Sequence, residues 1–239
     1  MLIDTIKTTL HQFIITEKSL NYQRFFKTAE GEYAYGDKFL GVSVPNIRKV
    51  VKEYFRDVDF KTIKYLLYSS WHEERLLALL LLTKQYQSKQ TTLKKKEQIF
   101  NFYIQHSKQI NNWDLVDVTS PHIIGNFLLD KDRDILYKFA NSKNLWEKRI
   151  SIVSTFEFIK YNQFDDTLKI SKILLLDKHD LIHKAVGWGL RNVGNKDIDK
   201  EILFLNKYHN IMPRTMLRYA IEKFDKPLRE KYLIKRSNK

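Results

Sequence analysis

The sequence contains no cysteine, which excludes disulfides, iron–sulfur clusters and thiol catalysis and is typical of a reducing compartment. Glycine and proline are also scarce, at 7 and 4 of 239 residues, so little interrupts helical segments. The segment 1–7 is broken by charge and lacks the apolar run of a signal peptide. The most apolar run, residues 76–82, is far too short to span a bilayer. We expect a soluble cytoplasmic protein.

Acidic residues are outnumbered. The chain has 42 Lys and Arg against 28 Asp and Glu, which gives a net charge of +14 and a pI near 9.6. Residues 180–239 hold 14 basic and 7 acidic residues, so a quarter of the chain carries half of the net charge. Such a surplus favours a nucleic acid or an anionic membrane as partner.

Apolar residues recur at three- and four-residue spacing nearly throughout, and convincing alternating strands are absent. This pattern predicts an all-α protein with about a dozen helices and short connectors. Each proline stands where a helix could begin, a position that proline tolerates. These prolines are Pro45, Pro121, Pro213 and Pro227.

Basic and aromatic positions also recur, at intervals of 38, 36, 35 and 34 residues. They are Arg75, Trp113, Arg149, Lys184 and Arg218. Such a period, with two helices per unit, predicts an α-solenoid of about six helix pairs that forms a single domain over residues 1–239. If these positions line the inner curve, the concave face is basic along its length and suits duplex DNA. A plain helical bundle is the alternative.

One segment combines an aromatic ring with a carboxylate. Trp113 and Asp117 are four residues apart, so a helix places them on the same face. Ser120 and Pro121 then break or kink the helix, which leaves the carboxylate of Asp117 available near a helix end. In the alternative interpretation Trp113 is a core residue and Asp117 merely faces solvent.

A second segment pairs an aromatic ring with cations. Lys184, Trp188 and Arg191 share a helical face, and Gly187 and Gly189 flank the tryptophan. A glycine inside a helix costs roughly 1 kcal/mol relative to alanine, so both glycines need a reason. The reason is either close helix packing or access of a DNA backbone to the indole face. The neighbouring cations favour the second explanation.

Two motifs are rejected as sites. The segment 36–43 imitates a phosphate-binding GxxxxGK[ST] loop but has Val42 where the lysine must be, so nucleotide hydrolysis is not expected. His179 and His183 have metal-ligand spacing, but no third ligand accompanies them. We therefore expect neither a metal nor another cofactor.

Several blocks resemble the HEAT-like-repeat family of DNA alkylation repair proteins, the AlkD-like alkylpurine DNA glycosylases. The resemblance runs from about residue 20 to the C-terminus, and the order and spacing of the blocks make it fairly specific. The blocks are residues 36–42 with Pro45, 113–117, Arg149-Ile150, 184–191, 212–215 and 217–220.

The resemblance implies that Asp117 is the catalytic carboxylate, that Trp113 and Trp188 hold the lesion nucleotide, and that Arg149 is a cation at the DNA backbone. One departure is Asn112, because active members often have a second tryptophan directly before the Trp-Asp pair. The family also contains relatives that bind DNA without detectable glycosylase activity. The residues expected to bind DNA are Arg149, Lys184, Arg191, Tyr35 and Arg218.

The expected function is hydrolysis of the N-glycosidic bond of N3- or N7-alkylated purines in duplex DNA, as in base excision repair, by a monomer. Such a base carries positive charge, so its glycosidic bond needs little general-acid help, and a carboxylate can stabilise the oxocarbenium-like sugar and position water. One alternative is a non-catalytic repeat protein that binds DNA by shape or branched structure. Another is a protein-binding scaffold, which would need an apolar or acidic inner face.

Overall fold

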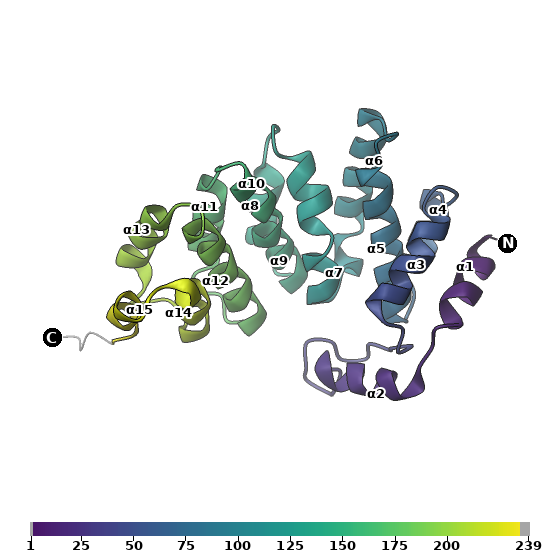
Figure 1. Ribbon diagram of the computed structural model, residues 1–239, viewed down its shortest axis with the longest axis horizontal. Helices are drawn as coiled ribbons and strands as arrows, with labels where there is room; N and C mark the ends of the chain where they lie inside the picture. Colours follow the sequence, from purple (N-terminus) through teal and green to yellow (C-terminus); the bar gives the residue numbers. More distant parts are fainter. Residues whose placement is uncertain (1, 235–239) are drawn as a thin grey trace. The chain divides into compact units, whose positions relative to one another are not determined.

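The computed structural model describes residues 2–234, and within that range it contains helices but no β-strand (Figure 1). A single isolated bridge joins Lys38 and Trp71. The chain forms two compact units, of which the first ends at Thr119 and the second begins at Ser120. None of the helices in residues 2–234 has the length and apolar character that crossing a membrane requires. The predicted all-α fold class is confirmed.

The first unit is built around α5 (His72–Gln87), which packs against α3, α4, α6 and α7. Its run Leu76–Leu82 is nowhere more than 4% exposed, because a helix that is apolar on every side is stable only when it is surrounded. The other helices are α1 (Leu2–His11), α2 (Thr16–Phe25), α3 (Val44–Tyr54), α4 (Phe60–Leu67), α6 (Leu93–Gln105), η1 (Ser107–Gln109) and α7 (Trp113–Asp117).

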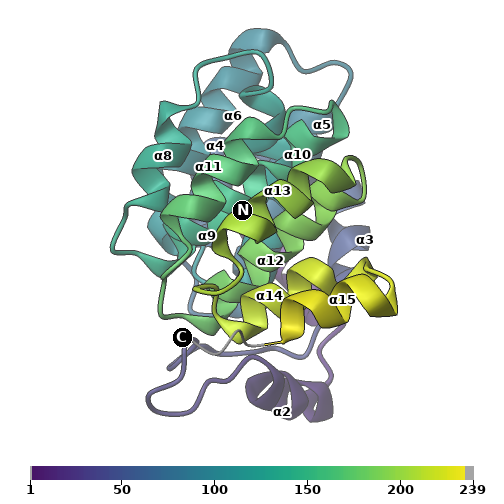
Figure 2. The same ribbon diagram turned by 90° about the vertical axis from the view of Figure 1, so that its left-hand side faces the viewer.

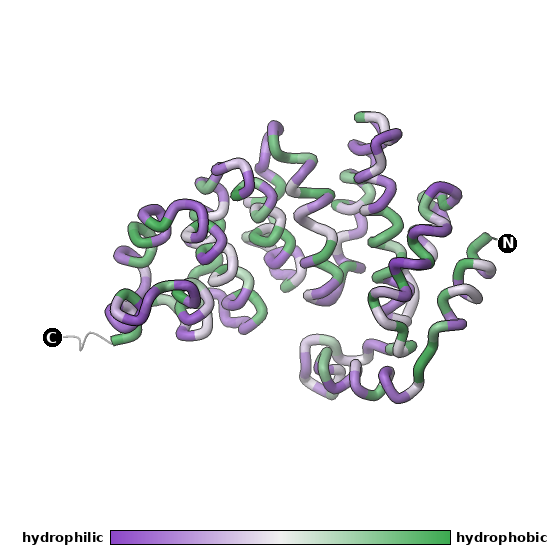
Figure 3. Tube along the Cα trace, viewed as in Figure 1, coloured by the Kyte–Doolittle hydropathy of each residue, from purple (hydrophilic) through white to green (hydrophobic). Residues whose placement is uncertain are grey.

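The second unit is built around α12 (Asp180–Gly194), which packs against α9, α10, α11, α13 and α14. Figure 2 shows α14 next to α12, and Figure 3 shows hydrophilic and hydrophobic residues alternating along the helices. The other elements are the π-helix η2 (Pro121–Gly125), α8 (Asp134–Ala140), α9 (Leu145–Ser154), α10 (Phe156–Lys160), α11 (Asp165–Ile173), α13 (Ile198–Tyr208), α14 (Arg214–Ala220), η3 (Ile221–Lys223) and α15 (Lys226–Leu233).

The prolines mark helix starts, as predicted. Pro45 and Pro227 lie in the first turns of α3 and α15. Pro121 is the first residue of η2, and Pro213 caps α14. Proline fits these positions because the first N–H groups of a helix have no intrahelical partner.

The recurring positions lie near the beginnings of five helices. They fall in the first five residues of α5, α7, α9, α12 and α14. The intervening helices complete the pairs, and α4 with α5, α8 with α9 and α11 with α12 pack directly on each other. The recurrence of about 36 residues therefore counts helix pairs, as expected for an α-solenoid.

The segment that imitates a phosphate-binding loop encloses an internal anion. The Glu73 carboxylate accepts hydrogen bonds from the backbone N–H groups of Leu40, Gly41 and Val42, at 2.8, 2.8 and 3.2 Å. Gly41 has a φ of +83°, and a Cβ there would lie 2.8 Å from the backbone nitrogen of Ser19. The loop thus has the backbone geometry of an anion nest, but it serves to fix the start of α5.

Candidate functional site

The short helix α7 carries both residues of the first candidate pair. Asn112 is fully buried, and its Oδ1 accepts a hydrogen bond of 2.8 Å from the Trp113 N–H as the N-cap. The helix ends at Asp117, so Trp113 and Asp117 lie one turn apart on the same face. Both side chains are partly exposed. Trp113 is therefore not a core residue, and the Asp117 carboxylate lies at a helix end, as the sequence predicted.

Aromatic side chains from the α2 region hold the Trp113 indole. Phe26 stacks on it with ring centroids 5.4 Å apart, and Phe25 meets it edge-on at 5.9 Å. The indole Nε1 donates a hydrogen bond of 3.2 Å to the Tyr33 hydroxyl. Phe25 is 64% exposed, which is unusual for a ring of this size. These contacts fix the orientation of the indole in a surface cluster of rings.

A buried network of charged side chains holds α7 in place. His72 is 2% exposed; its Nε2 lies 2.8 Å from an Asp114 oxygen, and its Nδ1 lies 3.2 Å from an Asp37 oxygen. Arg75 donates a second charged hydrogen bond to Asp37, at 2.5 Å. Burial alone would lower the pKa of His72, but the two carboxylates raise it to about 9. His72 is thus an imidazolium at neutral pH, and it ties α7 to the segment around Asp37.

Two of the recurring cations lie in the interior, and this differs from the expected surface of positive charge. Arg75 is 4% exposed and also donates to the Ser69 carbonyl at 3.0 Å. Arg149 is 5% exposed, and its Nη1 donates to the Leu181 carbonyl at 2.5 Å. Arginine suits such positions because its planar fork can satisfy several acceptors at once. The basic face predicted from the recurrence is therefore interrupted at both positions.

Trp188 lies partly exposed on α12, and its ring meets that of Phe156 edge-on at 4.7 Å. The flanking glycines face protein. A Cβ on Gly187 would lie 2.5 Å from Tyr219 Cβ and would overlap the Met216 carbonyl oxygen. A Cβ on Gly189 would meet Phe156 at 3.2 Å. The expectation that the glycines clear a path for DNA is wrong; close packing, above all of α12 on α14, explains them.

The other three cations predicted to bind DNA belong to the second unit and lie nearer the surface. Lys184 pairs with Asp180 at 2.7 Å, and its side chain is 39% exposed. Arg191 is partly exposed and pairs with Glu222, while Arg218 is exposed on α14. Exposed ion pairs contribute at most about 1 kcal/mol, so phosphate groups can compete for these cations.

The remaining predicted residues have simple placements. Tyr35 lies in the segment between α2 and α3 and is 67% exposed. His179 and His183 serve the start of α12. The first accepts the Leu181 N–H through Nδ1 at 3.1 Å, and the second contacts the Asp177 carbonyl through Nε2 at 2.5 Å. Tyr35, Trp113 and Asp117 belong to the first unit, and the residues from Arg149 onward belong to the second.

The sequence interpretation missed the groups that support Trp113. These are Phe25, Phe26 and Tyr33 beside the ring, and His72 with Asp37 and Asp114 below α7. A signal for the network existed, since four polar residues, 72–75, directly precede the long apolar run. Charged residues at a helix start are normally exposed, and nothing local indicates that all four are buried here.

The family model described as DNA alkylation repair enzyme matches residues 6–224. A search of curated proteins finds no match. The chain is similar to a solved structure described as a predicted DNA alkylation repair enzyme from Enterococcus faecalis, with a TM-score of 0.68 and 15% identity. That similarity covers 88% of this chain and 96% of the other, and at this identity it shows a shared fold. The family match spans nearly the whole sequence, so the chain belongs to the family of DNA alkylation repair enzymes.

Proposed function

We propose that this protein is a monofunctional DNA glycosylase that hydrolyses the N-glycosidic bond of N3- or N7-alkylated purines in duplex DNA. The observation that carries the proposal is Asp117, a partly exposed carboxylate one helical turn from the partly exposed Trp113. Buried charge and a ring cluster hold the short helix that presents them. The protein acts as a cytoplasmic monomer without a cofactor.

The chemistry requires little from the protein. When the bond from C1′ to the purine breaks, its electron pair goes to the positively charged base, which leaves neutral. Asp117 stabilises the cationic sugar and orients a water molecule, whose oxygen adds to C1′ while the carboxylate takes up its proton. Trp113 and Trp188 are the aromatic contacts of the lesion nucleotide, and an indole face attracts a cation by on the order of 0.5–2 kcal/mol.

Duplex binding is proposed to rest on phosphate contacts. Lys184, Arg191 and Arg218 have accessible guanidinium or ammonium groups, and Tyr35 adds an exposed ring. Arg149 acts from behind this surface, because its bond to the Leu181 carbonyl fixes the first turn of α12 while its charge adds to the local potential. Affinity should have little sequence preference and should fall steeply with salt.

A double charge reversal tests the binding surface. The variant K184E/R191E should lose duplex affinity across all sequences, by at least about tenfold at low salt, because it replaces two phosphate contacts with repulsion. The matched control is K89E/K94E, which reverses two exposed lysines of the first unit. Equal affinity of K184E/R191E and the wild type in a fluorescence anisotropy titration would refute the assignment.

The decisive test of the chemistry is Asp117→Asn. It keeps the size of the side chain but removes its charge, so base release from methylated duplex DNA should fall by about 10²–10³-fold. Duplex affinity should change little, since a carboxylate adds nothing to phosphate binding. Asp57→Asn, at an exposed acidic residue, is the charge-matched control. The measurement is chromatography of released bases at equal DNA occupancy, and wild-type release by Asp117→Asn would reject the mechanism.

The tryptophans make a second arm of this test. Trp113→Ala and Trp188→Ala should lower both base release and duplex affinity, because each removes an indole contact as well as support for the transition state. Loss of release without loss of affinity would place the indole in the chemistry alone. Wild-type values in both assays would exclude that tryptophan from the lesion site.

Asn112 favours a second candidate function, DNA binding by shape or branched structure without catalysis. It stands where active relatives often have a tryptophan, and its side chain is fully buried as a helix cap. It therefore offers no surface to a nucleotide. Failure of the wild type to release any alkylated base, with tight binding to duplex or branched DNA, would select this function.

A further inference from the structure

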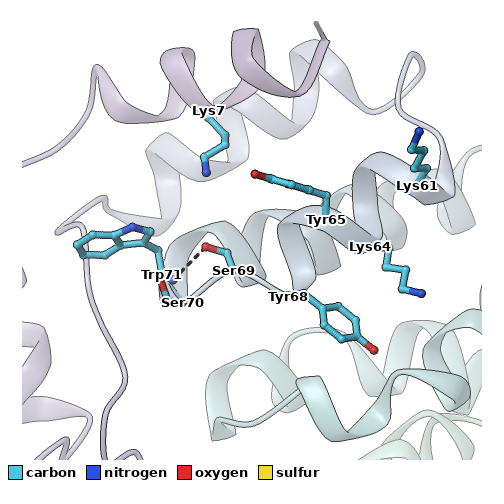
Figure 4. Close-up of a pocket in the computed structure, with 8 residues that line it drawn as sticks. All are labelled: Lys7, Lys61, Lys64, Tyr65, Tyr68, Ser69, Ser70 and Trp71. Atoms are coloured by element: carbon cyan, nitrogen blue, oxygen red, sulfur yellow. Dashed lines mark hydrogen bonds between the residues drawn. The ribbon is translucent and has the colours of Figure 1, made fainter.

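A cleft of about 590 Å³ lies in the first unit between α1, α4 and the connector from α4 to α5 (Figure 4). Its lining is cationic and aromatic: Lys7, Lys61, Lys64, Tyr65, Tyr68 and Trp71. The two remaining lining residues are serines, so none of the eight, all of them described by the structure, is acidic. This composition matches surfaces that bind nucleic acid strands, in which cations follow phosphates and rings receive bases.

The spacing along α4 produces the aromatic and basic face. Positions 61, 64, 65 and 68 follow the i, i+3, i+4, i+7 pattern of one helical face. Ile63, Leu66 and Leu67 are fully buried on the opposite side. Tyr65 and Tyr68 are 61% and 51% exposed. Two large rings therefore remain in solvent, although the opposite side of the same helix is packed into the core. The exposed face is available to a ligand.

Contacts within the unit hold the two tyrosine rings and one lysine in place. Lys7 Nζ lies 5.6 Å from the centre of the Tyr65 ring and 3.2 Å from the fully buried carboxylate of Glu74. The Tyr68 hydroxyl is 3.0 Å from His106 Nδ1. Figure 4 shows Lys7 reaching from α1 across the opening toward Trp71 and Tyr65. A site whose groups are already oriented loses less entropy when it binds.

We infer that this cleft binds an unpaired segment of a nucleic acid strand. The lysines hold its phosphates, and Tyr65 and Trp71 stack on its bases. An unpaired strand is favoured over a duplex because the faces of paired bases are covered by their neighbours, whereas an unpaired base can lie on a tyrosine ring. None of the eight residues that line the cleft is among those proposed above for duplex binding, and the inference does not depend on base excision.

The experiment measures anisotropy of a fluorescent oligothymidylate of about 12 nucleotides with the full-length protein. Tyr65→Ala should weaken binding at least about fivefold, because stacking on one ring is lost. Tyr65→Phe keeps the ring and should bind as the wild type does. K61Q/K64Q should weaken binding at low salt and reduce the salt dependence, because two phosphate contacts are lost.

The controls match each change elsewhere in the chain. Tyr161→Ala removes a 55% exposed ring of the second unit, and K89Q/K94Q removes two exposed charges outside the cleft. Neither should weaken oligothymidylate binding as much as its cleft counterpart. Trp71→Phe should reduce the quenching of intrinsic fluorescence that the oligonucleotide causes. Duplex affinity and base release by Tyr65→Ala should match the wild type, so failure here is distinct from failure of the glycosylase proposal.

Wild-type affinity of Tyr65→Ala for the oligothymidylate would overturn the inference. Loss of affinity in K61Q/K64Q alone would also overturn it, because the cleft would then be a site for acidic peptides or other polyanions that need no ring. Equal loss in K61Q/K64Q and K89Q/K94Q would show that only net charge matters, and would reject the cleft as a site.

Discussion

Trp113 in the first unit and Trp188 in the second are both partly exposed on a helix, but the two helices are held in different ways. The five-residue α7 is too short to be stable by itself and depends on the Asn112 cap and the ionic link from Asp114 to His72. The fifteen-residue α12 is the apolar centre of its unit, and it approaches α14 closely at Gly187. Electrostatics therefore position Trp113, whereas shape complementarity positions Trp188.

The largest effect on stability should come from removing the buried ionic interactions that hold α7. His72→Ala leaves the carboxylates of Asp37 and Asp114 without their shared cation, so the free energy of unfolding should fall by about 3–5 kcal/mol. Lys131→Ala, which removes an exposed ion pair in the second unit, should cost at most about 1 kcal/mol. Denaturant unfolding followed by tryptophan fluorescence measures both. Similar losses in the two variants would contradict the central role of His72.

The dependence of stability on pH should have a separate contribution from one buried group in each unit. The pKa of His72 is raised from 6.5 to about 9, so the folded chain keeps a proton that the unfolded chain releases. This contribution is complete below pH 6.5 and lost by about pH 9, on the order of 3 kcal/mol. In the second unit, burial raises the pKa of Glu201 from 4.5 to about 8, against the opposing effect of Arg191. The folded chain therefore keeps the Glu201 proton over a range in which the unfolded chain releases it, and stability falls as the pH rises from 4.5 to about 8.

Melting temperatures measured across this pH range test the two contributions. His72→Gln should flatten the profile between pH 6.5 and about 9. Glu201→Gln should flatten it between pH 4.5 and about 8 and should raise stability at the upper end of that range. Profiles parallel to the wild type in both variants would exclude these groups as the source of the pH dependence.

A smaller effect than that of His72→Ala should come from the glycines on either side of Trp188. Gly187→Ala forces a methyl group against the backbone of α14 and should cost about 1–3 kcal/mol. Gly189→Ala meets only side chains, at 3.2–3.5 Å, and gains roughly 1 kcal/mol of helix propensity, so its stability should stay near that of the wild type. Thermal unfolding compares the pair. Equal destabilisation would show that both glycines are required for packing.

Much of the local structure was predictable. The spacing of apolar residues predicted helices throughout, and the recurrence of about 36 residues predicted helix pairs. The end of α7 at Asp117 was also predicted, from Ser120 and Pro121. These properties depend on neighbours within a few turns of the chain, so a sequence pattern records them directly. The same signals did not predict the ring cluster at Trp113, because Phe25 and Phe26 come from a distant segment.

The sequence by itself determined the helical fold class, the positive charge and the pairing of Trp113 with Asp117 on one helical face. Only the tertiary structure decided which charges are accessible. Arg75 and Arg149 lie near helix starts as Lys184 does, yet both guanidinium groups are buried, because Asp37 and the Leu181 carbonyl, from remote segments, accept their hydrogen bonds. The backbone N–H groups of residues 40–42 bond to the Glu73 carboxylate for the same reason. A buried charge is stable only beside partners that solvate it, and folding chooses those partners.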